Sequence, residues 1–281
     1  MIKYPFSSKL MFAIVMHDTE ACRQFIEKLF PEKKVKEIRF RERDGKTRNE
    51  RGQNWNDSVA EVEKTIIMGL ERKSVRLDVL FEGDDTLYDI EMQVEREESI
   101  PRRSRYYHMA MGRNALRMGE NYSELKASYV IFICCYDAFG IDEPIYRFEM
   151  FDENLQLKLG DGSSTIILNT KCSEEKIPEE LKAFYSFVNT GKVDSSDKLV
   201  SYLDKRVEEA NENEEVDRIM TLEEELIIRY HTGLKKGREE GLAQGASQKQ
   251  REIAANLKNL GIGLNEIMKA TGLTETEIKD L

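Results

Sequence analysis

The sequence predicts an α/β protein with a helical C-terminal extension, and three patterns carry this prediction. Residues 76–95 contain two runs that alternate apolar and polar side chains around a short polar turn, which is typical of a β-hairpin. Residues 127–137 form a continuous apolar run, as a strand covered on both faces requires. From Pro178 onward, apolar residues recur at helical spacing. The chain therefore combines a sheet with flanking and trailing helices.

Length and composition indicate a folded protein. With 281 residues the chain can bury one substantial core and carry an appendage. Charged residues make up 34% of the chain and are spread along it. The net charge of −10 argues against an unselective nucleic-acid coat, but it permits a local basic patch.

Two features bear on location. The apolar run "LMFAIVM" near the start is too short to span a bilayer and has no small-residue cleavage pattern after it. The four cysteines lack CxxC spacing, so a structural zinc or a disulfide framework is not indicated. We expect a cytoplasmic protein without a membrane segment.

The N-terminal region is predicted to contain one helix, the hairpin and a second helix. Residues 7–30 have apolar side chains at helical spacing and end at Pro31. In the second strand of the hairpin, alternate residues from Asp89 to Glu95 share the polar face. The second helix starts near Ser99, a plausible N-cap, with Pro101 in its first turn.

Further strands and then helices are predicted after residue 127. Residues 144–150 look like a strand, and residues 155–170 look like a hairpin that turns at "GDG". The long helical region carries a glycine at every fourth position, which places these glycines on one helix face: Gly233, Gly237, Gly241 and Gly245. The last thirty or so residues look like a small helix-turn-helix. We predict a core over 1–190, a linker or assembly region over 191–245 and a helical tail over 246–281.

The hairpin raises a chemical question, because each of its strands interrupts an apolar pattern with an acid. Asp78 and Glu91 would lie on paired strands, where their oxygens could hold one Mg²⁺ ion. Gln93 would project from the same strand face as Glu91, within reach of a water between metal and phosphate.

These residues and their surroundings resemble the PD-(D/E)XK nucleases, and within them the Rpn family of recombination-promoting nucleases, also described as transposase-like. The resemblance covers nearly the whole chain. It depends on an ordered series of segments: "RLDVLFEGDDTLYDIEMQ", "RRSRYYHMAMGRNALRMGENYSELKASYVIFIC", "FGIDEPIYRFEM", "LGDGSSTIILNT", "PEELKAFYSFV" and "GREEGLAQG" followed by "IMKATGLTETEI".

The resemblance implies a restriction-endonuclease-like core, a central mixed sheet flanked by helices, that cuts DNA with Mg²⁺ or Mn²⁺. Asp78 and Glu91 would match the two metal-binding acids, and the carbonyl of Met92 would be a further ligand. Gln93 stands where the superfamily usually has lysine, and an amide can orient water but carries no charge. Glu20, on the first predicted helix, is a further candidate for the site.

Other interpretations of the same residues remain open. Polar faces of edge strands commonly carry Asp and Glu without any metal. A nuclease fold with weak or lost chemistry, acting as a DNA-binding or assembly protein, would also fit the glutamine at position 93.

A basic helix follows the hairpin and is the candidate DNA-binding surface. Arginine can bind phosphate oxygens in a bidentate manner, which positions a duplex without reading its sequence. We expect contacts to double-stranded DNA from Arg102, Arg103, Arg105, Tyr106 and Arg113. The alternative is that the tyrosine packs in the core and the arginines are solvated or paired with nearby acids.

The C-terminal helices are candidates for assembly. Glycines on one helix face permit close helix contact, and a homodimer would suit an enzyme that must cut two strands. Acidic residues in the terminal helix disfavour contact with phosphates, so a structural or oligomerisation role is preferred there.

Overall fold

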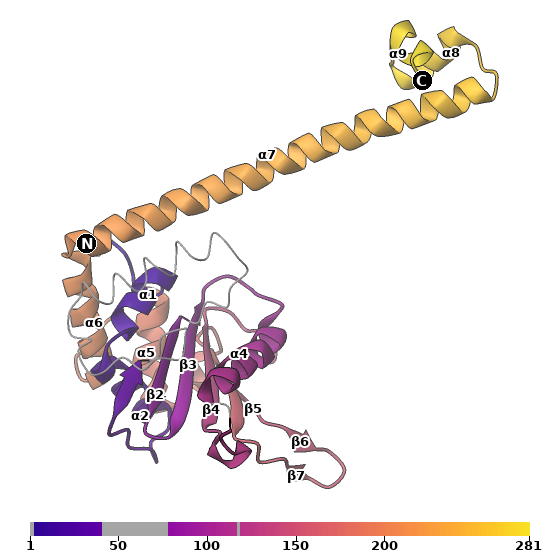
Figure 1. Cartoon of the computed structure of the whole chain (residues 1–281). Helices are drawn as coiled ribbons and strands as arrows, with labels where there is room; N and C mark the ends of the chain where they lie inside the picture. The colour runs from indigo at the N-terminus through magenta and orange to yellow at the C-terminus, as the bar shows by residue number, and fades with distance from the viewer. Residues whose placement is uncertain (1–2, 41–77, 117–118) are drawn as a thin grey trace. The chain divides into compact units, whose positions relative to one another are not determined.

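The structure, a computed structural model, describes residues 3–40, 78–116 and 119–281 (Figure 1). The first two residues of the predicted hairpin region, 76 and 77, lie outside this part. The chain divides into two compact units, Met1–Met220 and Thr221–Leu281. The three-part division expected from the sequence stays a prediction.

The first unit is built on a six-stranded mixed sheet in the order β1-β2-β3-β4-β8-β5. β1, β2 and β3 are antiparallel, β4 runs parallel to both β3 and β8, and β5 is antiparallel to β8. The strand bounds are Ile38–Phe40 for β1, Val79–Gly83 for β2, Thr86–Gln93 for β3, Ala127–Cys134 for β4, Ile145–Phe148 for β5 and Ser163–Asn169 for β8. The predicted α/β class and the predicted hairpin, formed by β2 and β3, are confirmed.

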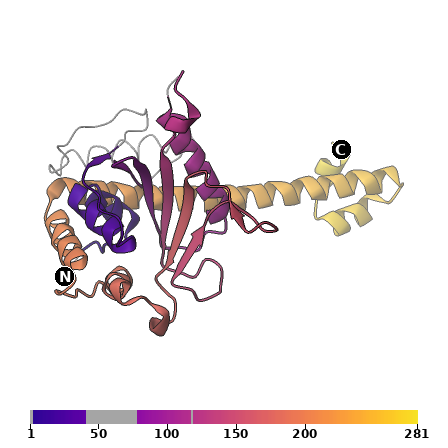
Figure 2. The same cartoon turned by 90° about the horizontal axis from the view of Figure 1, so that it is seen from below.

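Helices cover both faces of this sheet (Figure 2). One face carries α4, and the other carries the two N-terminal helices and the two helices that follow β8. Their bounds are Ile100–Ala115 for α4, Lys9–Met16 for α1, Thr19–Leu29 for α2, Glu179–Thr190 for α5 and Lys198–Asn211 for α6. Short 3₁₀ turns lie at Tyr122–Glu124 and Glu174–Lys176.

The central strand β4 is apolar from Val130 to Cys134, because both of its faces are buried there. Val130, Phe132 and Cys134 pack in the cluster beneath α4, together with Tyr107 and Met111 of that helix. The alternate residues, including Ile131 and Ile133, are fully buried on the opposite face. The continuous apolar run is therefore the sequence signature of a strand between two helical layers.

The single helix predicted over 7–30 is wrong, because the structure contains two helices with a break at His17 and Asp18. The Asp18 side chain accepts hydrogen bonds from the backbone N–H groups of Glu20 and Ala21, both at 2.9 Å, and so caps α2. Asp18 also accepts a bond from Tyr202 of α6 at 3.0 Å. The break thus ties α6 to the N-terminal helices.

The hairpin predicted to turn at "GDG" is also wrong. The residues before "GDG" form their own antiparallel pair, β6 (Phe151–Asp152) with β7 (Leu157–Lys158). The residues after it form β8, which pairs with β4 in the main sheet. Gly160 and Gly162 have positive φ angles of 71° and 76°. These two glycines lie where the chain passes from the small β6–β7 sheet to β8 of the main sheet, and their positive φ angles allow the change of direction.

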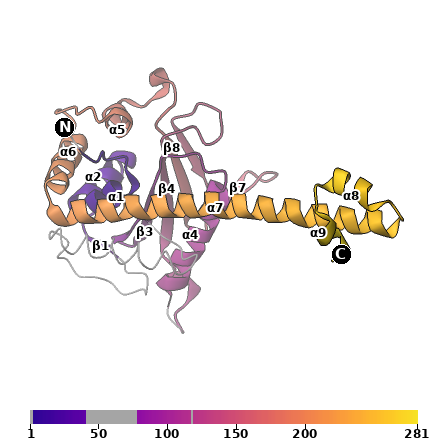
Figure 3. The ribbon, with the colours of Figure 1, turned by 90° about the horizontal axis from the view of Figure 1, so that it is seen from above.

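The second unit contains most of α7 (Glu214–Asn259), α8 (Leu264–Thr271) and α9 (Glu275–Lys279). Figure 3 shows α8 and α9 folded against the C-terminal part of α7. Their shared core consists of Ala254, Ile267, Leu273 and Ile278. α9 begins with a reciprocal capping box between Thr274 and Glu277. Within the described ranges, no helix is long and apolar enough to cross a membrane.

Candidate metal centre

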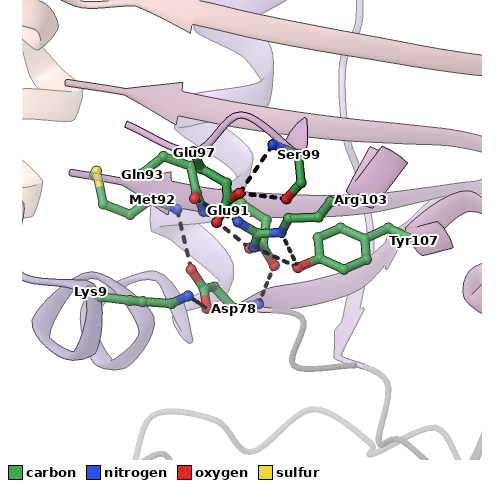
Figure 4. Close-up of polar contacts among 9 residues, drawn as sticks. All are labelled: Lys9, Asp78, Glu91, Met92, Gln93, Glu97, Ser99, Arg103 and Tyr107. Carbon is green, nitrogen blue, oxygen red and sulfur yellow. Dashed lines mark hydrogen bonds and ion pairs between the residues drawn. The ribbon is translucent and has the colours of Figure 1, made fainter. Parts of the chain in front are cut away.

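The register of the β2–β3 hairpin brings two carboxylates together. Val79 pairs with Ile90, so Asp78, just before β2, lies beside Glu91 of β3. The backbone N–H of Asp78 donates to Oε1 of Glu91 at 2.8 Å (Figure 4). The backbone N–H of Met92 donates to Oδ2 of Asp78 at 3.3 Å. The backbone itself therefore holds the two acids side by side.

Each of the two carboxylates faces a cation from a neighbouring helix. Lys9 of α1 places Nζ 3.4 Å from Oδ1 of Asp78, and Arg103 of α4 places a terminal nitrogen 3.0 Å from Oε2 of Glu91. Both carboxylate side chains are completely buried, whereas the lysine is 39% exposed and the arginine 22%. The cations are thus the partly exposed members of both ion pairs.

Arg103 also contacts the glutamine of the predicted site. One terminal nitrogen donates to Oε1 of Gln93 at 2.8 Å. The amide nitrogen of Gln93 in turn lies 3.4 Å from Oε2 of Glu91. On its other side the guanidinium donates to Oη of Tyr107 through Nε at 3.1 Å and through the nitrogen bound to Glu91 at 2.6 Å. Hydrogen bonds to β3 on one side and to its own helix on the other therefore fix the orientation of the planar guanidinium.

Negative charge is in excess at this point of the sheet. Burial, and then the charge of Asp78, raise the pKa of Glu91 to about 8. Asp89, two residues earlier on the same strand face, is fully buried, and neither of its carboxyl oxygens has a hydrogen-bond partner in the described part of the chain. Burial, and then the charges of Glu91 and Asp78, raise the pKa of Asp89 well above its usual value.

This donor set fits a hard divalent cation. Carboxylate and carbonyl oxygens are the ligands that Mg²⁺ and Mn²⁺ prefer, and an added cation would offset the repulsion that raises the pKa of Glu91. Among residues 3–40, 78–116 and 119–281, no group of three or more His, Cys, Asp and Glu side chains is arranged to hold a metal. Asp78 and Glu91 would therefore be completed by a backbone carbonyl, for which Met92 is the candidate, and by water.

The residues predicted to bind DNA separate into two groups on α4. Arg103 points into the carboxylate pair, whereas the rest of the set is exposed to solvent: Arg102, Arg105, Tyr106 and Arg113. The opposite stripe of the helix, which includes Ser104, Tyr107 and Met111, is buried against the sheet. The solvated basic face and the site-facing arginine thus come from one amphipathic helix.

Sequence reasoning did not identify Lys9, Asp89 or Tyr107 as part of this centre. Tyr107 follows Arg103 by four residues, a spacing that places both on one helix face and could have signalled their contact. Lys9 carries no such local signal, because it meets Asp78 only through the packing of α1. Glu20 instead pairs with Arg23 of its own helix at 2.5 Å.

Comparison with known protein families places most of the chain in one of them. The family model described as "PD-(D/E)XK nuclease family transposase" matches residues 58–241, about two thirds of the chain. Comparisons with curated proteins and with solved structures give no match.

Proposed function

The chain belongs to the PD-(D/E)XK nuclease family transposases, and from that premise we propose that it is a metal-dependent DNA endonuclease with little sequence specificity. The observation that carries this proposal is the meeting of Asp78 and Glu91, held by backbone hydrogen bonds beside Gln93. Nucleases of this superfamily generally use divalent metal ions.

The residues divide the chemistry among them. Asp78, Glu91 and the Met92 carbonyl would hold Mg²⁺ or Mn²⁺, which polarises the phosphate and lowers the pKa of bound water. Gln93 would orient the attacking water through its amide, which can both donate and accept a hydrogen bond. Because an amide cannot take the proton of that water, we expect turnover to depend strongly on pH.

Double-stranded DNA is the proposed substrate. The exposed arginines of α4, Arg102, Arg105 and Arg113, would contact phosphates, with Tyr106 on the same face. Contacts of this kind fix a duplex without reading bases, so cutting would tolerate many sequences. We place this activity in the cytoplasm, in DNA recombination or in processes of mobile elements and phages.

The test is relaxation and linearisation of supercoiled plasmid with Mg²⁺, Mn²⁺ or EDTA. We expect Asp78→Ala to lower metal-dependent cutting by at least about a hundredfold, the scale of losing one transition-state-stabilising group. Asp85→Ala is the matched control, because this acid of the same hairpin has a side chain that is 99% exposed. Equal cutting by wild type and a folded Asp78→Ala protein would refute the assignment.

A second candidate function is a catalytically weak nuclease scaffold that binds DNA. The observation that favours it is the neutral amide of Gln93 where the superfamily usually has lysine. Under this alternative the folded protein retards DNA at low salt but leaves plasmid intact with every metal.

A further inference from the structure

Arg103 differs from the other arginines of α4 in what its charge faces. Arg102, Arg105 and Arg113 are exposed, while the Arg103 guanidinium is bonded to Glu91, Gln93 and Tyr107. It also lies against aromatic rings, 5.4 Å from the ring centre of Tyr107 and 5.9 Å from that of Phe132. A side chain held this way is part of the centre rather than of the solvated face.

The oxygens that Arg103 contacts are the same oxygens that a metal would need. Oε2 of Glu91 accepts from both Arg103 and Gln93, and Oε1 accepts from the backbone of Asp78. A carboxylate has roughly four lone-pair positions, so three are already in use. A divalent cation entering from solvent must compete with the guanidinium, and the two positive charges repel each other once both are present.

The hydrogen bonds to Tyr107 would keep the Arg103 guanidinium near the site after it leaves Glu91. Oη of Tyr107 accepts from two nitrogens of Arg103, and this hydroxyl is not a metal ligand candidate. Loss of the Glu91 bond would therefore leave the arginine tethered at the same end of α4. Once its bond to the Glu91 carboxylate is lost, the guanidinium would bind another anion. A phosphate of bound DNA can accept two hydrogen bonds from it.

We propose that Arg103 is a metal-gated phosphate ligand: without metal it closes the carboxylate pair by binding Glu91 and Gln93, and with metal it turns to the DNA backbone. This inference rests on the proposed nuclease function. It couples the two ligands, so metal raises DNA affinity and DNA raises metal affinity by the same factor, typically about 5- to 150-fold.

Metal affinity without DNA is the first readout, measured by calorimetric titration of Ca²⁺ and Mn²⁺ at pH 8.5. Arg103→Gln removes the competing charge, so we expect metal to bind at least about fivefold more tightly than to wild type. Arg105→Gln, which removes an exposed charge from the same helix, is the matched control and should change affinity less than about twofold. Tyr107→Phe keeps the charge of Arg103 but removes its anchor, and should strengthen metal binding by a smaller factor.

DNA affinity is the second readout, measured by fluorescence anisotropy of a labelled duplex with Ca²⁺ or with EDTA, with a gel to confirm that the duplex stays intact. Wild type should bind more tightly with Ca²⁺ than with EDTA. Arg103→Gln should lose most of this gain and keep its affinity in EDTA, whereas Arg105→Gln should weaken both conditions alike. An unchanged metal-dependent gain in Arg103→Gln would overturn the proposal.

The outcomes separate this inference from the function on which it rests. If wild type binds neither metal and cuts no plasmid, both fail. If wild type binds metal and Asp78→Ala does not, but Arg103→Gln and Tyr107→Phe both match wild type, only the role of Arg103 fails. Thermal unfolding of each variant in EDTA identifies any that does not fold, and Tyr107→Phe then carries the test.

Discussion

Asp89 carries a buried carboxyl group to which no hydrogen bond is made within the described part of the chain. Its carboxyl group is fully buried next to two other acids, and its oxygens lack hydrogen-bond partners among the described residues. The resulting rise of its pKa means that the folded state binds this proton more strongly than the unfolded chain does. The free energy of unfolding contributed by Asp89 is therefore lost as the pH rises from about 4 through the raised pKa.

Asp89→Asn should accordingly stabilise the metal-free protein at high pH. We expect the free energy of unfolding to increase by about 1–3 kcal/mol at pH 8 and by much less at pH 5, because the cost of the raised pKa of Asp89 grows as the pH rises above the pKa of an unfolded aspartate, about 4. Urea unfolding in EDTA at the two pH values measures this difference. Asp85→Asn, at an exposed position of the same hairpin, should be neutral at both. A loss of stability at pH 8 would mean that the Asp89 carboxylate is ionised and compensated.

At the scale of elements, four glycines that recur every fourth residue lie on one face of α7. A Cβ added at Gly233, Gly237, Gly241 or Gly245 would meet no described atom within 4 Å. Glycine in a helix interior costs about 1 kcal/mol relative to alanine. Among the described residues, these positions therefore weaken the helix without a packing contact that requires glycine. A homodimer that packs at this face, as predicted from the sequence, would supply such a contact.

Gly237→Ala distinguishes a free face from an assembly face. If the face is free, the helix should gain about 0.5–1 kcal/mol, seen as a higher melting temperature by circular dichroism. If two copies meet there, the added methyl groups should weaken the dimer in sedimentation velocity, which is the result that the homodimer predicted from the sequence would give. Ala243→Gly, on the opposite side of the same helix, is the reverse control and should lower stability without changing assembly.

The elements also show what the sequence could and could not predict. The hairpin with Asp78 and Glu91 was predictable because strand periodicity and turn residues are local signals. The break before α2 was missed although it carries a local signal, because Asp is disfavoured in helix interiors and preferred as an N-cap, and the Asp18 side chain does cap α2. The contacts of Lys9 and Arg103 with the carboxylates join separate elements, so they depend on helix packing that periodicity does not encode.

For the whole molecule, the candidate centre and the C-terminal tail belong to different compact units. Every residue of the candidate centre lies before residue 110, and the buried core of the second unit lies after Gly245. Each unit thus buries its own apolar residues. The glycine face lies between these two cores in the sequence.

A chain ending at Gly245 should therefore keep the unfolding transition of the first unit. We expect plasmid cutting within about twofold of the full chain, because every residue of the candidate centre belongs to the first unit. Differential scanning calorimetry should lose only the contribution of the small C-terminal core, and sedimentation velocity would show whether the tail supports the dimer. Aggregation or loss of the first transition would mean that the tail is needed for folding of the core.

The turn between β2 and β3 has a consequence for how this chain can change over generations. Gly83 pairs with Thr86, so only Asp84 and Asp85 make the turn. Deleting one of them leaves too few residues to reverse the chain, and the strands must pair one residue out of step. Side chains alternate in a strand, so Glu91 and Gln93 would then rotate away from Asp78. A length change tolerated in most surface loops would here erase the site in a single genetic event, while leaving the composition of both strands intact.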